Sequence, residues 1–264
     1  DWRVSLIIAE DVANEKYCKF KDKLEAMEVG IRTGFAYHTL GTVASPLEGF
    51  VKLEIKKRRD GKEYFCVFYS GPIRSAGGTG SSVSLLIADY IRKKNGYSTY
   101  DPSEEEVKRY STELYDYHER ITNLQYLPSV VEIEFLAKQI PIQISGDPSE
   151  KMEVSNYKDT PRVDTNRIRN GVCLVMGEGL AQKAPKLWKQ LSVWGSDFGL
   201  DNWNFLKEFI QLQKKIKSKG DTNETEEGND EKIKADYTYI KDLVAGRPVL
   251  THPLAPGGFR LRYG

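Results

Sequence analysis

The chain has 264 residues, 29% of them charged, and a net charge of +1 at pH 7. This length allows one large domain or two smaller ones with a substantial core, and the near-neutral charge means that any nucleic-acid contact must come from local basic clusters. The odd number and wide separation of Cys18, Cys66 and Cys173 argue against a disulfide framework and favour a reducing, cytoplasmic setting. The three histidines and these cysteines predict no zinc site, and no apolar run is long enough to span a membrane.

The first 70 residues predict two helices followed by a β-hairpin. Residues 3 to 40 have the apolar spacing of two amphipathic helices. Gly49 to Lys57 and Lys62 to Ser70 resemble strands, and the Asp60-Gly61 pair between them is a strong hairpin signal. The first strand alternates apolar and charged residues, whereas the second is apolar on both faces, so we expect the second to be more buried.

A glycine-rich segment, Tyr69 to Gly80, precedes an expected helix from Ser81 to Lys94. Its backbone amides and Arg74 would suit a phosphate or another anion. The segment lacks the spacing and the lysine of a P-loop. A plain tight connection that needs positive φ at Gly77 and Gly78 is an equally open interpretation.

The middle of the chain predicts two helices, the first of them with a capping box. Ser103 and Glu106 form a capping box, and the apolar spacing continues as far as Leu124. This aromatic seam is typical of a core-facing stripe, with a coiled-coil partner surface as the alternative. A helix from Ser129 to Ile140 and a short strand at Ile142 to Ile144 follow before an irregular segment.

The last third predicts more helix. Residues 166 to 194 have a helical pattern that Pro185 should kink or restart, and Asp201 caps a further long helix. Residues 218 to 235 are predicted to be a mobile insertion, with a short helix at 236 to 245 after it. The fold class predicted is α+β, predominantly α-helical with a small antiparallel hairpin or sheet.

Four blocks in order carry a family resemblance: GPIRSAGGTG from Gly71, RVDTNRIRNG from Arg162, EGLAQKAPKLW from Glu178 and GRPVLTHPLAPGGFRLRYG from Gly246. Together they resemble the large, catalytic subunit of the archaeal family D DNA polymerases. The resemblance covers nearly the whole chain, and it implies that residues 1 to 264 are an N-terminal domain of a longer subunit.

The resemblance also implies what the complete enzyme needs. It would extend primed DNA templates, use Mg²⁺, carry structural zinc elsewhere, pair with a small 3′–5′ exonuclease subunit, and work with a sliding clamp. The N-terminal part would meet DNA and the catalytic core of its own subunit, and a homodimer is a further expectation. Polymerases hold two metals with closely spaced carboxylates, and this chain has no Asp-x-Asp, so no catalytic or metal-binding residue is assigned and no cofactor is expected within the fragment.

Basic clusters supply the candidate DNA contacts, because polynucleotide binding needs cations that meet phosphates at intervals. In the extended tail, Arg260 and Arg262 point to one face; solvated arginines on an edge strand are the alternative. For Arg162, Arg167 and Arg169, salt bridges to Asp164 or Glu178 compete with DNA contact. At the hairpin tip, Lys56 to Arg59 with Lys62 are better explained by solubility than by insertion into a groove. The full set of predicted nucleic-acid-binding residues is Arg74, Gly77, Gly78, Thr79, Arg162, Arg167, Arg169, Lys183, Lys186, Arg247, Arg260 and Arg262.

The leading hypothesis is therefore a non-catalytic, DNA-binding and assembly domain of a replicative polymerase. One alternative is a purely structural module that uses the tyrosine-rich seam and apolar faces for subunit contacts. The other is a small-molecule phosphate enzyme built around Gly71 to Gly80, which lacks the expected lysine and metal carboxylates.

Overall fold

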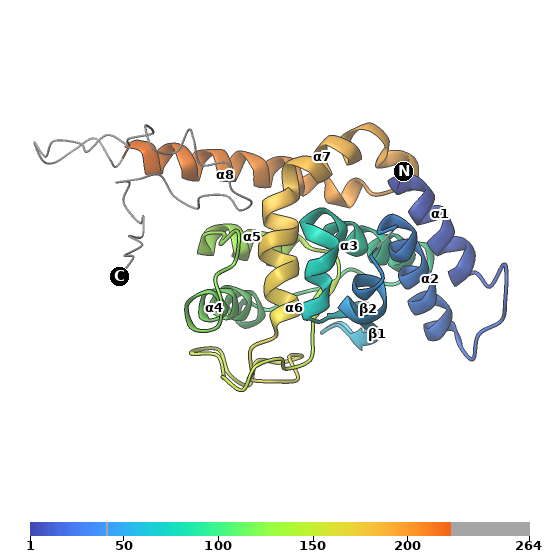
Figure 1. The fold of residues 1–264 in the computed structure, drawn as a ribbon, viewed down its shortest axis with the longest axis horizontal. Helices are drawn as coiled ribbons and strands as arrows, with labels where there is room; N and C mark the ends of the chain where they lie inside the picture. Colours follow the sequence, from blue (N-terminus) through green and yellow to red (C-terminus); the bar gives the residue numbers. More distant parts are fainter. Residues whose placement is uncertain (41, 223–264) are drawn as a thin grey trace, which may run out of the picture. The chain divides into compact units, whose positions relative to one another are not determined.

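The computed structural model describes residues 1–40 and 42–222. The chain separates into two compact units, Asp1–Ile216 and Lys217–Gly264. The description below concerns the first unit, drawn in colour in Figure 1. The predicted helix at 236–245 and the candidate residues Arg247, Arg260 and Arg262 lie outside the described residues.

The two helices predicted for residues 3 to 40 are confirmed, and they form an antiparallel pair. Helix α1 spans Trp2–Ala13 and α2 spans Lys23–His38. They pack closely because α2 presents glycines to α1: a Cβ at Gly30 would lie 2.6 Å from the Ala9 carbonyl oxygen, and one at Gly34 would lie 2.6 Å from that of Ser5. Any larger side chain at these two positions would push the helices apart.

The predicted hairpin is confirmed and belongs to a three-stranded mixed sheet. Strand β1 spans Phe50–Lys57, β2 spans Glu63–Tyr69 and β3 spans Gln143–Ser145. β1 pairs antiparallel with β2, and β3 pairs parallel on the other side of β2. The central strand β2 is buried from Tyr64 to Tyr69, as its two apolar faces indicated. The parallel partner adds to the antiparallel hairpin that the sequence predicted.

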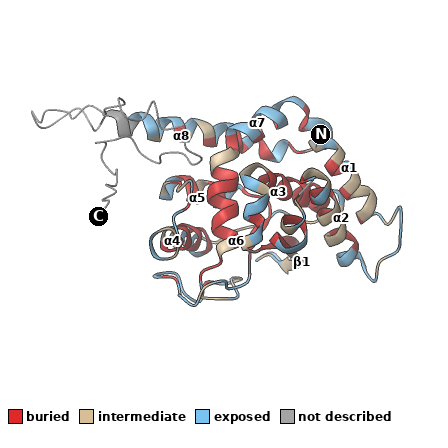
Figure 2. Ribbon diagram, viewed as in Figure 1, coloured by how far each residue is buried: buried red, intermediate tan, exposed pale blue. Residues whose placement is uncertain are grey.

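The sheet leads into the most buried helix. A π-helical turn at Ser45–Gly49 precedes β1, and a 3-10 helix at Gly71–Ala76 follows β2. Helix α3 then spans Gly77–Lys94, four residues longer at its start than predicted, and Figure 2 shows it among the buried elements. At its far end the buried Asp89 accepts hydrogen bonds from Arg92 Nε, Asn202 Nδ2 and Trp203 Nε1 at 2.7 to 2.8 Å, which ties the chain before α8 to α3.

Helices α4 (Glu104–Arg120) and α5 (Val130–Gln139) both begin with complete capping boxes, from Ser103 with Glu106 and from Ser129 with Glu132. The aromatic seam of α4 faces the core: Tyr110 and Tyr117 are 5% and 4% exposed, and Leu114 is fully buried. A coiled-coil surface is therefore excluded for this seam. The helix ends at Arg120, short of the predicted Leu124.

Residues 170–194 form one continuous helical run whose middle is widened. It consists of α6 (Asn170–Cys173), a π-helical segment (Leu174–Ala181) and α7 (Gln182–Trp194). Pro185 lies inside α7, where it cannot donate to the carbonyl of Ala181. Gln213 Nε2 donates to that carbonyl instead, at 3.0 Å. Two 3-10 turns, Ser196–Phe198 and Asp201–Asn204, lead into α8 (Phe205–Thr222), which includes the first residues of the predicted insertion.

A buried ionic network fixes the long irregular segment 146–169, visible below α4 in Figure 1. The Glu113 carboxylate, fully buried, accepts from Arg169 N, Nε and Nη2 at 2.6, 3.0 and 2.7 Å. It also accepts from Arg109 Nε at 3.4 Å, and the Arg109 guanidinium donates onward to the carbonyls of Tyr157, Thr165 and Arg167. One acidic residue of α4 thereby holds a segment that has almost no secondary structure of its own.

We predict that Glu113→Gln lowers the free energy of unfolding by about 3–5 kcal/mol, because it leaves two buried guanidinium groups without their counter-charge. Chemical denaturation measures this loss. Glu119→Gln, at an exposed position of the same helix, is the matched control and should change stability by less than about 0.5 kcal/mol. The double variant Glu113→Leu/Arg169→Met should lose less than the sum of its single variants. Equal stability of Glu113→Gln and wild type would contradict the central role of this carboxylate.

Candidate nucleic-acid interface

The glycine-rich segment is a helical connection. Its first part is the 3-10 helix Gly71–Ala76, and α3 begins at Gly77, whose φ is 68°. Gly78 does not have a positive φ, which corrects the expectation from the sequence. It is needed for a different reason: a Cβ there would lie 2.1 Å from the Glu178 carbonyl oxygen. Gly78 lets the start of α3 touch the π-helical segment, and the neighbouring Thr79 is half-buried.

Arg74 is held by an internal carboxylate. Its Nη2 donates to Glu178 Oε1 at 2.7 Å, and the same oxygen accepts from the backbone N–H of Gln125 at 2.9 Å. The Arg74 side chain is 41% exposed, whereas that of Glu178 is 7% exposed. A phosphate that drew Arg74 away would leave a buried carboxylate with one donor, which disfavours Arg74 as a main DNA contact.

The space beside this segment is small. A depression lined by Arg74, Gly77, Gly78 and Glu178 among others has a volume of about 10 Å³, which is room for about one water molecule. A mononucleotide does not fit there. The small-molecule phosphate enzyme therefore has no support at this position in the described residues.

Arg162 is committed to two carboxylates. Its Nη1 lies 2.5 Å from Asp101 Oδ1 and its Nη2 lies 2.6 Å from Glu106 Oε2. The guanidinium also lies over the rings of Tyr64 and Tyr100, at 5.5 and 5.2 Å from their centroids. These partners are not the Asp164 and Glu178 considered from the sequence, which pair with Lys56 and Arg74 instead.

The contact with Arg162 also changes the pKa of Asp101. Burial of its carboxyl group raises the pKa, but hydrogen bonds from Arg162 and Arg59 outweigh this and lower the pKa to about 2. The Asp101 side chain is 14% exposed. Arg162 therefore works as a structural cation between α4, the hairpin and the segment 146–169.

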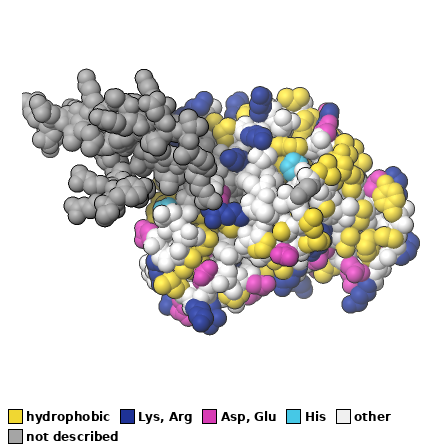
Figure 3. Space-filling view, viewed as in Figure 1, with side chains coloured by type: hydrophobic (Ala, Val, Ile, Leu, Met, Phe, Trp, Pro, Cys, Tyr) yellow, Lys and Arg dark blue, Asp and Glu magenta, His cyan; other side chains and the backbone are white. Residues whose placement is uncertain are grey.

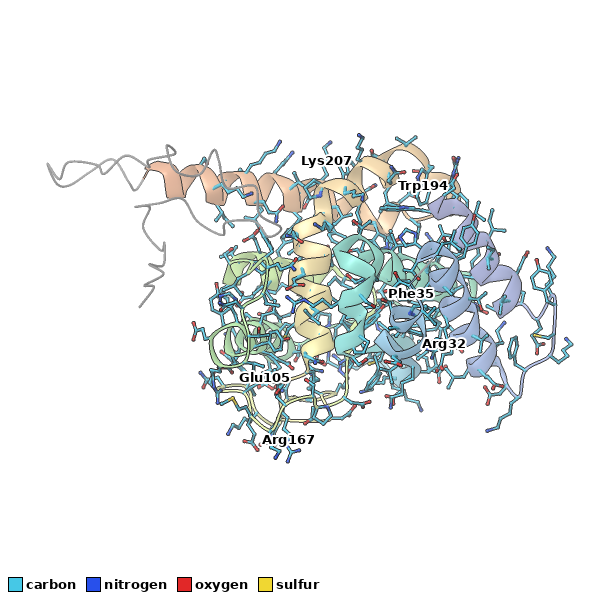
Figure 4. The ribbon with its side chains drawn as sticks, in the orientation of Figure 1. Arg32, Phe35, Glu105, Arg167, Trp194 and Lys207 are labelled. Atoms are coloured by element: carbon cyan, nitrogen blue, oxygen red, sulfur yellow. The ribbon has the colours of Figure 1, made fainter. Side chains whose placement is uncertain are left out.

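Arg167 and Arg169 differ in burial. Arg169 is 1% exposed and bound to Glu113. Arg167 is exposed and lies at the outer edge of the segment in Figure 4. Residues 146–169 contain five acidic residues and, besides Arg167, four basic ones, so the segment as a whole is not a basic patch. We therefore leave Arg162 and Arg169 out of the proposed interface, and Arg167 stands alone.

A further group of basic residues lies on α7 and α8. Lys183, Lys186 and Lys189 recur every third residue of α7, which contains no acidic residue. Lys207 and Lys214 are two turns apart on the exposed side of α8. We call these five residues the lysine row. In Figure 3 dark blue side chains gather over α7 and the start of α8, and Figure 4 shows Lys207 pointing outward.

The lysine row differs from the arginines in its partners. Within the described part of the chain, no salt bridge joins any of its five members to a carboxylate. The positive charge of Lys186 also affects His38. The pKa of His38 is lowered, first by burial and also by this charge. Sequence reasoning selected Lys183 and Lys186 but missed Lys189, Lys207 and Lys214, although spacings of three and seven residues were visible.

No three His, Cys, Asp or Glu side chains among the described residues are grouped closely enough to hold a metal ion. None of the described helices is both long and apolar enough to cross a membrane.

The chain is similar to one family over nearly its full length. Residues 2–212 match the family model "DNA polymerase II large subunit DP2, N-terminal", and residues 224–264 match the model of its central domain. The chain is 45% identical to the DNA polymerase II large subunit of Nanoarchaeum equitans, covering 100% of this chain and 23% of that protein. It is 46% identical to that of Methanosarcina barkeri, with 98% and 22% covered. The chain thus spans less than a quarter of these relatives.

We predict that Asp101 contributes to the acid sensitivity of the fold. Its pKa is depressed to about 2 in the folded protein, so its contribution is fully present above the ordinary aspartate pKa and is lost as the pH falls through about 2. Wild type and Asp101→Asn should therefore differ in free energy of unfolding at pH 5 and converge toward pH 2. Denaturation at several pH values measures the difference, and a difference that stays constant over this range would refute the assignment.

Proposed function

The chain belongs to the family of the DNA polymerase II large subunit, the large subunit of the archaeal family D polymerases, and we propose that it forms a non-catalytic part that helps to hold DNA. The lysine row is the observation that carries this proposal. Five lysines on two helices, four of them exposed and Lys183 half-buried, have no paired carboxylate and resemble the cation spacing that phosphate contacts need. A replicative enzyme accepts any template, and backbone contacts carry no sequence preference.

The acidic residues of the unit support a non-catalytic role. Nucleotidyl transfer requires paired carboxylates that are free to hold two metal ions. The buried acids here already have structural partners: Glu106 and Glu132 close capping boxes, Glu113 binds two arginines, and Asp89 binds Arg92 and Trp203. Moving any of them toward a metal would leave buried donors unpaired.

We further propose, on family membership alone, the needs of the complete enzyme. It would extend primed DNA, require Mg²⁺, carry structural zinc, and work with an exonuclease subunit and a sliding clamp. The present chain would dock on the catalytic core of its own subunit. These partners lie beyond the residues described here.

A structural assembly module without DNA contact is the second candidate. The observation that favours it is the loop between α2 and β1, where Leu40, Val43 and Leu47 are 80%, 66% and 60% exposed. Apolar side chains exposed together in this way are typical of contact surfaces. The tyrosine-rich seam does not contribute, because it is buried within the unit.

The lysine row is tested by salt-dependent binding of primed DNA to the 264-residue chain. Lys186→Ala/Lys189→Ala/Lys207→Ala should weaken binding and make the slope of log affinity against log salt shallower by about 0.9 for each lysine that meets a phosphate of duplex DNA. Lys21→Ala/Lys108→Ala/Lys151→Ala removes the same charge from exposed positions on other elements and should keep most of the slope.

Two outcomes would reject the proposal in this form. Identical slopes for the triple variant and wild type would show that the lysine row does not meet DNA. No binding of wild type even at low salt would leave assembly as the function of this part.

A further inference from the structure

A groove lies between the tip of the hairpin and the turn that follows α3. Lys57, Lys62 and Glu63 line it from the hairpin, and Asn95, Gly96 and Tyr97 line it from the turn. Its volume is about 780 Å³, within the range of about 300–1,000 Å³ that is typical of ligand clefts. The sequence marked the hairpin tip only as a charged, soluble turn.

Both walls of the groove are fixed in place. The backbone N–H of Ser98 donates to the Glu63 carbonyl at 2.8 Å, which joins the turn to β2. The Tyr97 ring packs on that of Phe65, with centroids 5.1 Å apart. Gly61 and Gly96 have φ of 82° and 76°, and nothing lies within 4 Å of where their Cβ atoms would be. The hollow is therefore preformed and bare of side chains at these two points.

The charge of the groove favours an anion. Lys57 has no carboxylate within 4.0 Å among the described residues, and the nearest one to Lys62 is that of Asp60 at 3.9 Å. Asp60 lies closer to Arg58 Nε, at 3.2 Å. Glu63 is the acidic side chain in the wall, opposite Lys57 in the strand register. Two lysines thus remain available to a ligand.

The C-terminus of α3 does not repel an anion as strongly as a helix end with unpaired carbonyl groups would. Its last carbonyls already accept hydrogen bonds: that of Ile91 from Asn95 Nδ2 at 2.8 Å, and that of Lys93 from the Gly96 N–H at 3.1 Å. Beyond the helix, the Tyr97 carbonyl accepts from Arg92 Nη1. Basic side chains and caps therefore offset the negative end of the helix dipole.

We propose that this groove binds a single nucleic-acid strand through its phosphates, as a contact separate from the lysine row. The volume admits a nucleotide. Two lysines beside the ring of Tyr97 match the combination of cations and an aromatic side chain that single-strand grooves use, which favours an unpaired strand over a duplex. The inference rests on the proposed function only in taking DNA as the ligand.

The test uses the 264-residue chain and a labelled oligothymidylate, with affinity measured over a series of salt concentrations. Lys57→Ala/Lys62→Ala should make the slope of log affinity against log salt shallower by about 0.7 per lysine, roughly 1.4 in all, and leave duplex binding unchanged. Lys21→Ala/Lys108→Ala is the control with equal charge change. Lys57 and Lys62 are both exposed. The thermal unfolding of the groove variant should therefore match that of wild type, which would exclude a folding defect.

The outcomes separate this inference from the proposed function. A wild-type slope for the groove variant on the single strand overturns the groove, whatever the lysine-row variant does on primed DNA. A loss only in the lysine-row variant keeps the proposed function and rejects the groove, and the reverse result keeps the groove alone. Competition by free deoxynucleotide as effective as by the oligonucleotide, or by polyglutamate, would also overturn it, in favour of a free nucleotide or an acidic protein.

Discussion

The buried carboxylate of Glu113 is the constraint on which much of the unit depends. Two arginines meet it, Arg169 from the segment before α6 and Arg109 from its own helix. Through Arg109 the charge reaches three carbonyls of the irregular segment, and Arg169 Nη1 also lies 3.3 Å from Ser145 Oγ on β3. A buried charge without partners is strongly unfavourable, so the helix, the third strand and the segment can only be placed together.

This network divides the basic residues by chemistry. Arg74, Arg162 and Arg169 each bind carboxylates of the unit. Arg162 makes a bidentate contact with Glu106, and Arg169 makes one with Glu113. The rigid, planar guanidinium suits such buried pairing, whereas a lysine ammonium on a flexible stem stays hydrated at the surface. The cations proposed to meet phosphate are accordingly lysines, on α7 and α8 and at the hairpin tip. Structural cohesion and the proposed phosphate contact therefore use different residues.

The position of the lysine row depends on how the helical run of residues 170–194 packs against α3 and α8. Gly78 allows α3 to touch the carbonyl of Glu178 in the π-helical segment, where a methyl group would not fit. Pro185 then breaks the backbone pattern of α7, and Gln213 of α8 takes the freed carbonyl of Ala181. This side-chain bond joins α8 to the residue that directly precedes α7. A glycine and a proline, neither of them charged, thus position the charges.

The sequence by itself determined helix α4 with its capping box, the hairpin at Asp60-Gly61, the buried seam of α4 and the family, because each rests on local spacing or on motifs in order. It predicted two members of the lysine row. It did not predict the parallel pairing of β3, the role of Gly78, or which cations are buried. Those features join residues tens of positions apart, such as Glu113 with Arg169 and Arg162 with Asp101. The sequence shows which residues are charged, but it does not show which distant residue neutralises each charge. Only the tertiary structure therefore decided which basic residues remain exposed to meet a phosphate.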